Sequence, residues 1–324
     1  MLSFEKIFDK IKIAIEELDF SRQPVELYAP IEYTLSLGGK RIRPVLCLMA
    51  CDMFGGQIED AVPAALGLEI FHNFTLLHDD IMDEAPIRRG KTSVYKKWNT
   101  NVAILSGDTM MAVAYDKIME TPGNMHSSVF KIFNQTAIEV CEGQQYDMNF
   151  ETDDNVSIDD YLKMIRLKTA VLLAGSLKIG AIIGGADNES AENLYQFGEN
   201  IGIAFQLKDD LLDVFSDEQK FGKKTGGDIT TNKKTYLYLK AFELAKGKTL
   251  KNLNTLFTEY QKSDIDKVNG VIEIYKQLNI KQLAEELIEK YYRQAMTSLD
   301  KVKVDNSQKT ELKKFADKLK GRES

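Results

Sequence analysis

Proline placement constrains the fold of this chain more than any other feature of its sequence. All six prolines lie at or before Pro122, and the following 202 residues contain none. Many stretches of that part carry apolar residues at positions i, i+3, i+4 and i+7, as in YLKMIRLKTAVLLAGSLKIGAIIGG and IKQLAEELIEKYYRQAMTSLDKV. This spacing is the helical period, and runs of alternating β-branched residues are missing from the sequence. We therefore expect a nearly all-α protein.

Polar or glycine-containing stretches separate the expected helices. They are residues 36–44, 151–157, 184–190, 216–234 and 261–270. Ser157 and Asp160 fit a capping box that opens a helix. The stretch 216–234 is long and rich in glycine and lysine, and a loop of this length is uncommon unless it acts as a lid or a binding loop. Because no low-complexity linker divides the chain, we expect a single domain over residues 1–324.

The net charge and the cysteine content limit the expected binding partners and the expected cellular compartment. The net charge of −7 disfavours nucleic acid or an anionic membrane as the main partner, so an anionic ligand would need a local basic patch or a metal ion. The three cysteines (Cys47, Cys51 and Cys141) are unlike a disulfide framework and indicate a reducing cytoplasm. The N-terminus lacks the apolar region of a signal peptide, and no apolar run approaches the roughly 18 residues of a membrane span. We expect a cytoplasmic protein without integral membrane association.

Two aspartate groups share the spacing Asp-Asp-x-x-Asp. They are Asp79, Asp80 and Asp83 in LLHDDIMD, and Asp209, Asp210 and Asp213 in FQLKDDLLD. On a helix, the first and last members of each group face the same way, and like charges at this spacing are modestly destabilising. Clustered acids usually form a solvated face, but apolar residues surround both groups here. Magnesium binds one or two carboxylates together with substrate phosphates, so we expect two facing helices that hold magnesium ions and a diphosphate.

Basic residues accompany both acidic groups. They are Lys40, Arg41 and Arg43 in GGKRIRP, Arg88 and Arg89 after the first group, Lys168 beside Thr169 in RLKTA, and Lys223, Lys224 and Lys233 after the second group. The glycines of GGKRIRP let backbone N–H groups approach a phosphate. In an acidic protein, this arrangement indicates anion binding, both directly and through metal ions.

These motifs, taken in order, resemble those of the trans-polyprenyl diphosphate synthases. The resemblance rests on GGKRIRP, HNFTLLHDDIMD with RRG, GQQYD, KTA, FQLKDDLLD and FGKKTGGDI, and it covers nearly the whole chain. It implies the isoprenoid synthase fold, an antiparallel helical bundle around a deep central cavity, usually as a homodimer. It also implies head-to-tail condensation of isopentenyl diphosphate with an allylic diphosphate.

The resemblance assigns roles residue by residue. The implied metal ligands are Asp79, Asp83 and Asp209, with Asp80, Asp210 and Asp213 supporting them. The positions that bind the allylic diphosphate are Arg88, Lys168, Thr169, Gln206, Lys223 and Lys233. Those that bind isopentenyl diphosphate are Lys40, Arg43, His72 and Arg89. Gln144 and Asp147 of GQQYD match an element that faces the cavity. The implied cofactor is Mg²⁺, as three ions, with Mn²⁺ able to replace it.

The implied chemistry begins with ionisation of the allylic C–O bond. Magnesium ions, arginine and lysine would stabilise the departing diphosphate. The allylic cation would meet the Lys168 carbonyl, the Thr169 hydroxyl, the Gln206 amide and the Phe205 ring. The isopentenyl double bond then attacks, and the released diphosphate takes the proton, since no side chain is an obvious base.

Product length in this family depends on residues just before the first aspartate. A helix places Phe74 about one and a half turns before Asp79, with Thr75 beside it and Phe71 nearly one turn further. A bulky Phe74 should block long chains, so we expect geranylgeranyl diphosphate as the product. Farnesyl diphosphate and longer chains remain as alternatives, as does a core role for Phe74 with the cavity floor set by other helices.

Three other protein classes fit the motifs less well. A terpene cyclase usually lacks the second aspartate group and GGKRIRP, which are both present. A non-catalytic subunit of a heteromeric synthase would have damaged acidic groups, whereas both are intact. A di-iron bundle needs two Glu-x-x-His pairs, and only Glu69 with His72 has this spacing.

Overall fold

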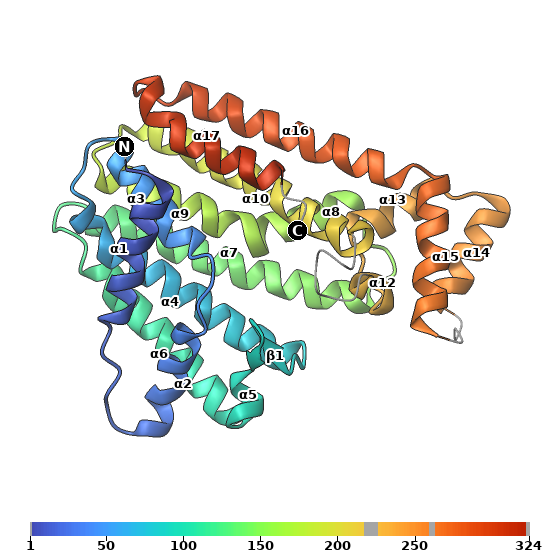
Figure 1. Ribbon diagram of the computed structural model, residues 1–324, viewed down its shortest axis with the longest axis horizontal. Helices are drawn as coiled ribbons and strands as arrows, with labels where there is room; N and C mark the ends of the chain where they lie inside the picture. Colours follow the sequence, from blue (N-terminus) through green and yellow to red (C-terminus); the bar gives the residue numbers. More distant parts are fainter. Residues whose placement is uncertain (1, 217–225, 259–262, 322–324) are drawn as a thin grey trace. The chain divides into compact units, whose positions relative to one another are not determined.

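The chain folds almost entirely into helices, as its periodicity predicts. A computed structural model describes residues 2–216, 226–258 and 263–321. Its elements up to the first long polar loop are α1 (Phe4–Glu16), α2 (Val25–Ser36), α3 (Ile42–Met53), α4 (Ile58–Met82), β1 (Ile87–Arg88), β2 (Lys91–Thr92), α5 (Val94–Lys97), α6 (Thr100–Met119) and α7 (His126–Thr152). The later elements are α8 (Ile158–Ile165), the π-helix η1 (Arg166–Ala170), α9 (Val171–Ile183), α10 (Asn188–Phe215), α12 (Gly227–Thr230), α13 (Tyr236–Leu244), α14 (Gly247–Thr258), α15 (Asp264–Gln277), α16 (Ile280–Lys301) and α17 (Asn306–Lys320) (Figure 1).

These elements form two compact units. The first unit comprises residues 1–137, 172–195 and 301–312, and the second comprises residues 138–171, 196–300 and 313–324. The boundaries fall inside α7, α9, α10, α16 and α17. The division does not test the prediction of one domain over residues 1–324, which stays a prediction.

The core of the first unit is built around α3 and α4, which contact each other, and α6 packs along α4 (Figure 1). Helix α3 is buried at nine of its twelve positions, so it is apolar on nearly every side. Pro44 falls in the first turn of α3, where proline is tolerated because those N–H groups have no helical partner, whereas Pro63 lies inside α4, in its second turn. This packing holds the 25 residues of α4 as one helix that ends at the first aspartate group.

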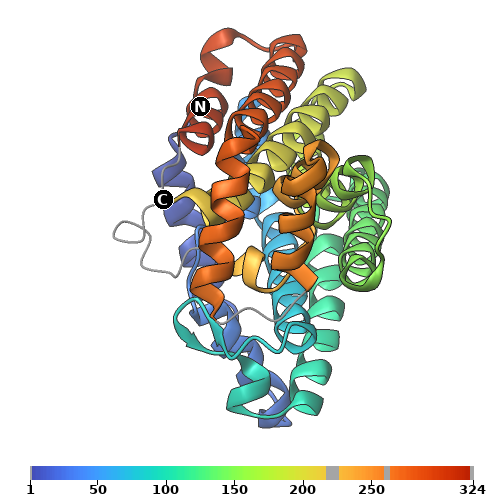
Figure 2. The same ribbon diagram turned by 90° about the vertical axis from the view of Figure 1, so that its right-hand side faces the viewer.

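The second unit has a core of its own, formed by apolar side chains of the α7 C-terminal half, α8, α10, α13, α15 and α16. Ser157 and Asp160 make the predicted capping box at the start of α8. Figure 2 is turned so that the side of Figure 1 on which α14 and α15 lie faces the viewer. Helix α15 contacts both α12 and α14. The short helix α12 is thereby held beside the apolar core.

The predicted loops at 36–44, 151–157 and 184–190 separate consecutive helices, but they were too long, since α3 begins at Ile42, α7 continues to Thr152 and α10 begins at Asn188. The predicted break over 261–270 is wrong beyond Ser263. The Ser263 side chain accepts a hydrogen bond from the Asp266 backbone N–H, at 3.1 Å, and this N-cap starts α15 at Asp264. Of the predicted loop 216–234, residues 217–225 lie outside the described ranges, and the short helix α12 (Gly227–Thr230) interrupts the described part. Within those ranges, none of the helices has the length and apolarity to cross a membrane.

Candidate active site

The first aspartate group lies at the carboxyl end of α4, in the first unit. Asp79 and Asp80 belong to the last turn, and Asp83 is the C-cap residue, whose backbone N–H bonds to the Asp79 carbonyl oxygen at 2.8 Å. Asp83 is exposed and Asp79 is half-buried, whereas only 3% of Asp80 is exposed. The helical geometry expected for the group is therefore present, with Asp80 turned into the protein.

Asp80 pairs with Arg88 from the hairpin that follows α4. The Arg88 Nε and Nη2 atoms donate to the same carboxylate oxygen, at 2.8 and 2.5 Å. The hairpin turns at Arg89 and Gly90, which both have positive φ (51° and 75°), as a type I′ turn requires. This turn places Arg88 beside the first aspartate group, whereas Arg89 lies away from that group.

Arg89 reaches the glycine loop before α3. Its guanidinium donates to the Gly38 carbonyl oxygen and, at 3.4 Å, to the Asn73 side-chain oxygen. Gly39 has a φ of 129°, and a Cβ built there would lie 2.8 Å from the Arg89 guanidinium carbon. The positive φ of Gly39 favours glycine, and Arg89 joins the GGKRIRP loop to the RRG turn.

A group of cationic side chains surrounds His72 on α4. The Arg43 guanidinium lies 3.1 Å from the His72 imidazole nitrogen. Burial, followed by Arg43, Arg89, Arg41 and Arg88, holds the pKa of His72 well below its usual value. Burial also lowers the pKa of Arg43 to about 10, although Glu69 opposes the shift. His72 is thus neutral, and the positive charge gathered here is suited to an anion. Lys40, on the same loop, is exposed.

Glu69 is the internal counter-ion of this cationic group. It forms an ion pair with Arg41 at 2.5 Å, and the two side chains are 2% and 6% exposed. Asn73 donates to a Glu69 carboxylate oxygen at 2.9 Å, so Glu69 also orients the amide that contacts Arg89. Sequence reasoning missed the role of Glu69 and Asn73. The available signal was their i, i+4 spacing on the face of α4 that carries His72.

The second aspartate group lies in the last two turns of α10, in the second unit. Asp210 is 5% exposed and accepts hydrogen bonds at both oxygens, from Tyr161 and from Gln206 at 2.9 Å. Gln206 in turn accepts a bond from the Thr169 hydroxyl at 3.2 Å. The structure therefore brings together the predicted Thr169, Gln206 and Asp210, and adds Tyr161, which the sequence reasoning missed.

Asp213 binds the segment that follows the second group. Its carboxylate accepts from the Asp228 backbone N–H at 2.9 Å. Burial, with Asp210, Asp213 and Asp147 nearby, raises the pKa of Asp228 to about 7, although Lys233 lowers it. Lys233 is exposed but acts electrostatically on both Asp210 and Asp228. The predicted Lys223 lies outside the described residues.

Lys168 and Thr169 are carried by the π-helix η1, which the periodicity did not predict. Lys168 pairs with Asp147 of α7 at 2.5 Å, so the KTA and GQQYD motifs meet. A Cβ built on Gly143 would lie 2.2 Å from the Lys168 backbone nitrogen. Glycine is therefore required for α7 to approach η1. Single-turn π-helices occur frequently at functional sites, because the extra residue changes the direction of side chains.

Aromatic rings cluster one to two turns before the first aspartate group. The Phe71 and Phe74 centroids are 5.6 Å apart, and Phe71 also packs on Phe133 at 5.5 Å. Phe74 contacts the His78 ring at 4.7 Å. The Thr75 hydroxyl is bonded to the His72 carbonyl oxygen at 2.8 Å. Phe71 is fully buried and Phe74 is half-buried.

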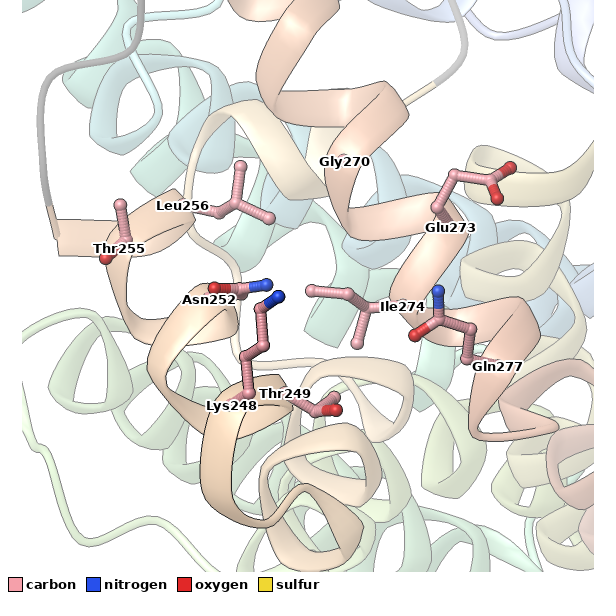
Figure 3. A pocket seen from close by; sticks show the side chains of 9 residues that line it. All are labelled: Lys248, Thr249, Asn252, Thr255, Leu256, Gly270, Glu273, Ile274 and Gln277. Atoms are coloured by element: carbon pink, nitrogen blue, oxygen red, sulfur yellow. The ribbon is translucent and has the colours of Figure 1, made fainter.

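The second unit also contains a pocket of about 540 Å³ between α14 and α15 (Figure 3). Its lining is mixed, with Leu256 and Ile274 among polar side chains such as Lys248 and Asn252. None of the residues singled out by the sequence lines this pocket. We do not assign the candidate chemistry to it.

The carboxylates of both aspartate groups are candidate magnesium ligands. Across the described ranges, no three His, Cys, Asp or Glu side chains gather as a preformed metal site. Magnesium does not need one, because it typically takes one or two carboxylates and completes its shell with water and substrate phosphates. Burial, followed by the negative charge of Asp210, raises the pKa of Asp228, and a divalent cation nearby would favour its ionised form. The donor set therefore fits Mg²⁺.

An all-helical fold that carries two Asp-Asp-x-x-Asp groups and a group of cationic side chains is typical of enzymes that bind diphosphates with divalent metal ions. The polyprenyl synthetase family model matches residues 24–275. The chain belongs to this family. Within it, the chain is 43% identical to a geranylgeranyl diphosphate synthase of Methanosarcina mazei over 72% of both chains. It is 36% identical to that of Sulfolobus acidocaldarius over 93% of both chains.

Solved structures agree with this assignment. A crystal structure of a geranylgeranyl pyrophosphate synthase matches the whole chain with a TM-score of 0.94 and 42% identity, and all of that chain is covered. The predicted isoprenoid synthase fold is confirmed. A relative with a different name is the geranylfarnesyl diphosphate synthase of Natronomonas pharaonis, 37% identical over 68% of this chain and 70% of its own length.

Proposed function

We propose that the protein is a trans-prenyltransferase that condenses isopentenyl diphosphate with allylic diphosphates and makes geranylgeranyl diphosphate. One observation carries the proposal. In the first unit, α4 presents a carboxylate ridge at its end and, one to three turns earlier, the neutral His72 within a cationic group. A metal-bridged diphosphate and a directly bound diphosphate are the two ligands that such neighbouring groups would take.

The cationic group would bind isopentenyl diphosphate. Arg43 and Arg89 are held by His72 and by the glycine loop, and Lys40 is exposed beside them. Because the imidazole is neutral, it can accept from Arg43 and donate to a phosphate oxygen through its other nitrogen. Binding a diphosphate would offset the mutual repulsion of the guanidinium groups.

The allylic diphosphate would be bound by Arg88, Lys168, Lys223 and Lys233. Bound Mg²⁺, proposed as three ions held through Asp79, Asp83 and Asp209, would neutralise charge on the leaving diphosphate. Asp80 would position Arg88, and Asp213 would position the segment that carries Lys233. The Thr169 hydroxyl and the Gln206 amide would face the allylic cation, and the Lys168 carbonyl and the Phe205 ring would add to its stabilisation. Mn²⁺ would serve in place of Mg²⁺.

Product length would be set by the aromatic cluster of α4. Phe71 packs on Phe133, and Phe74 packs on Phe71 and His78, so these contacts would hold both rings in place. The chain's similarity to geranylgeranyl diphosphate synthases supports a twenty-carbon product. Farnesyl and longer products are the alternatives that the assay below separates.

We also infer a cytoplasmic homodimer. Helix α6 exposes Leu105 and Met119, which are 58% and 49% exposed and lie on the same face, and Ile104 is 41% exposed. Exposed apolar side chains on one helical face are typical of protein interfaces. Sedimentation equilibrium of the purified protein tests this state directly.

The decisive assay incubates the purified protein with Mg²⁺, labelled isopentenyl diphosphate and ten-carbon or fifteen-carbon allylic starters, and sizes the dephosphorylated products. We expect a twenty-carbon product, which lengthens in Phe74→Ala because the floor is removed. Asp79→Ala should abolish turnover at saturating Mg²⁺. Full turnover by Asp79→Ala would overturn the proposed reaction, and a wild-type product of thirty carbons or more would overturn the role of Phe74.

A further inference from the structure

A chain of hydrogen bonds joins Tyr161 of α8 to Thr169 of η1 through two residues of α10. Tyr161 bonds to one oxygen of the Asp210 carboxylate, and the Gln206 nitrogen lies 2.9 Å from the other. The Gln206 oxygen lies 3.2 Å from the Thr169 hydroxyl. Tyr161 and Asp210 are 1% and 5% exposed, so the end of the chain away from Thr169 is sealed from water.

Elementary hydrogen-bond chemistry sets the direction of every bond in this chain. Burial raises the pKa of Asp210, whereas Lys233 and the hydrogen bonds from Tyr161 and Gln206 favour its ionised form. An ionised carboxylate only accepts, so Tyr161 and the Gln206 amide nitrogen both donate to it. With its nitrogen committed, Gln206 presents its oxygen to Thr169. An amide oxygen also only accepts, so Thr169 must donate its single proton to it. The lone pairs of the Thr169 oxygen then point away from Gln206 and are free to stabilise a positive charge.

We propose that Tyr161 is a positioning residue for the prenyl transfer, acting through Asp210 and Gln206 to hold the Thr169 hydroxyl with its lone pairs toward the developing allylic cation. This inference rests on the proposed function. Tyr161 touches no substrate in this scheme. Its part is to immobilise Asp210, because a carboxylate bonded at only one oxygen can rotate and release the Gln206 amide.

Tyr161 is the residue that we infer holds the Asp210 carboxylate in place. Lys233 and Asp147 act on Asp210 electrostatically, from the segment after α12 and from α7. Tyr161 comes from α8, whose start is fixed by the capping box of Ser157 and Asp160. A rigid helix start and a fully buried ring give the hydroxyl a single location.

The first test is Tyr161→Phe, which removes one oxygen atom and keeps the ring. We expect kcat to fall by about tenfold to a hundredfold, the effect of losing a hydrogen bond to a charged group. The KM for isopentenyl diphosphate should stay within about twofold, because the change affects only the transition state. Tyr275→Phe is the matched control. Tyr275 is equally buried in the same core, and its variant should keep the wild-type kcat.

A double-mutant cycle with Thr169→Val separates positioning from a general structural effect. If Tyr161 acts through Thr169, Tyr161→Phe should cause little further loss of kcat once the threonine hydroxyl is gone. Additive losses, an unchanged kcat in Tyr161→Phe, or an equal loss in Tyr275→Phe would each overturn the proposal. The wild-type assay separates failure of the Tyr161 proposal from failure of the proposed function. If the wild-type protein makes no prenyl product, both the Tyr161 proposal and the proposed function are overturned.

A second variant applies if Tyr161→Phe does not fold. Asp210→Asn still accepts from Tyr161, but it donates toward Gln206, which must turn its amide over and then donate to Thr169. We expect a kcat loss comparable to that of Tyr161→Phe, with the Mg²⁺ concentration for half-maximal rate unchanged. A rise in the required Mg²⁺ would identify Asp210 as a metal ligand and overturn its role in the chain.

Discussion

Glu69→Ala should destabilise the protein more than any surface carboxylate change in the first unit. The substitution leaves the Arg41 guanidinium, 6% exposed in its ion pair, without its carboxylate at 2.5 Å. Removing one partner of a buried ion pair typically costs about 3–5 kcal/mol, because the remaining charge stays buried. Asn73 also loses an acceptor at 2.9 Å, although its nitrogen keeps the Glu69 backbone oxygen at 2.8 Å. We therefore expect a loss of about 4 kcal/mol.

The control is the exposed pair between Lys10 and Glu59. Its N–O distance is 2.8 Å, close to that of the buried pair, but its side chains are 46% and 68% exposed. Glu59→Ala should cost less than about 1 kcal/mol, since solvent and salt screen the interaction. The free energy of unfolding is measured by urea denaturation followed by circular dichroism.

The double variant Arg41→Met with Glu69→Leu tests the reasoning. It removes both charges and fills the space with apolar side chains, so it should cost less than about 2 kcal/mol. The Leu35 carbonyl oxygen loses the Arg41 donor, which accounts for most of that cost. If the double variant were as unstable as Glu69→Ala, an uncompensated buried charge would not be the cause, and the argument would fail.

Two further predictions follow from the site. Gly143→Ala should destabilise by about 1–3 kcal/mol and lower activity, because the added Cβ meets the Lys168 backbone, whereas Gly123→Ala, with nothing within 4 Å, should be tolerated in the same denaturation assay. Because the folded pKa of His72 is depressed, only the unfolded chain takes up its proton below pH about 6.5, so acid should destabilise the wild type. The variant His72→Gln has no group at this position that titrates. The difference in free energy of unfolding between wild type and His72→Gln should therefore change by up to about 1.4 kcal/mol per pH unit below that pH, measured by unfolding curves between pH 7.5 and 5. A difference that stays constant with pH would refute this prediction.

Much of the fold could be read from the sequence because its signals are local. The absence of proline after Pro122, the capping box at Ser157 and the spacing of the aspartates all act within a few residues, and the structure has helices where they predict them. The two-strand hairpin at residues 87–92 was not predicted, because strands of two residues have no period to detect. The break predicted over 261–270 was too long, since Ser263 starts a helix that polar residues alone do not exclude.

The candidate site was predicted less completely, for a physical reason. Motif residues such as Asp79 and Lys168 can be recognised in the sequence by their residue type and spacing. Residues that hold the motif residues in place have no such recognisable pattern. Glu69 stands in a helix with ordinary spacing, and Tyr161 is one aromatic residue among many. The π-helix at residues 166–170 depends on how closely α7 can approach, which is a tertiary property. Such residues are found only when the contacts are known.

The position of both aspartate groups within their helices has a consequence for the resting protein. Each group falls at the carboxyl end of a long helix, α4 or α10, where the aligned peptide dipoles already place partial negative charge. Acids are usually favoured at the opposite end, so the metal-free chain carries an electrostatic penalty at two helix ends. A bound divalent cation would offset both the carboxylate repulsion and the helix dipole, and would so serve as a C-terminal cap. Adding magnesium should then slow amide hydrogen exchange at the ends of α4 and α10.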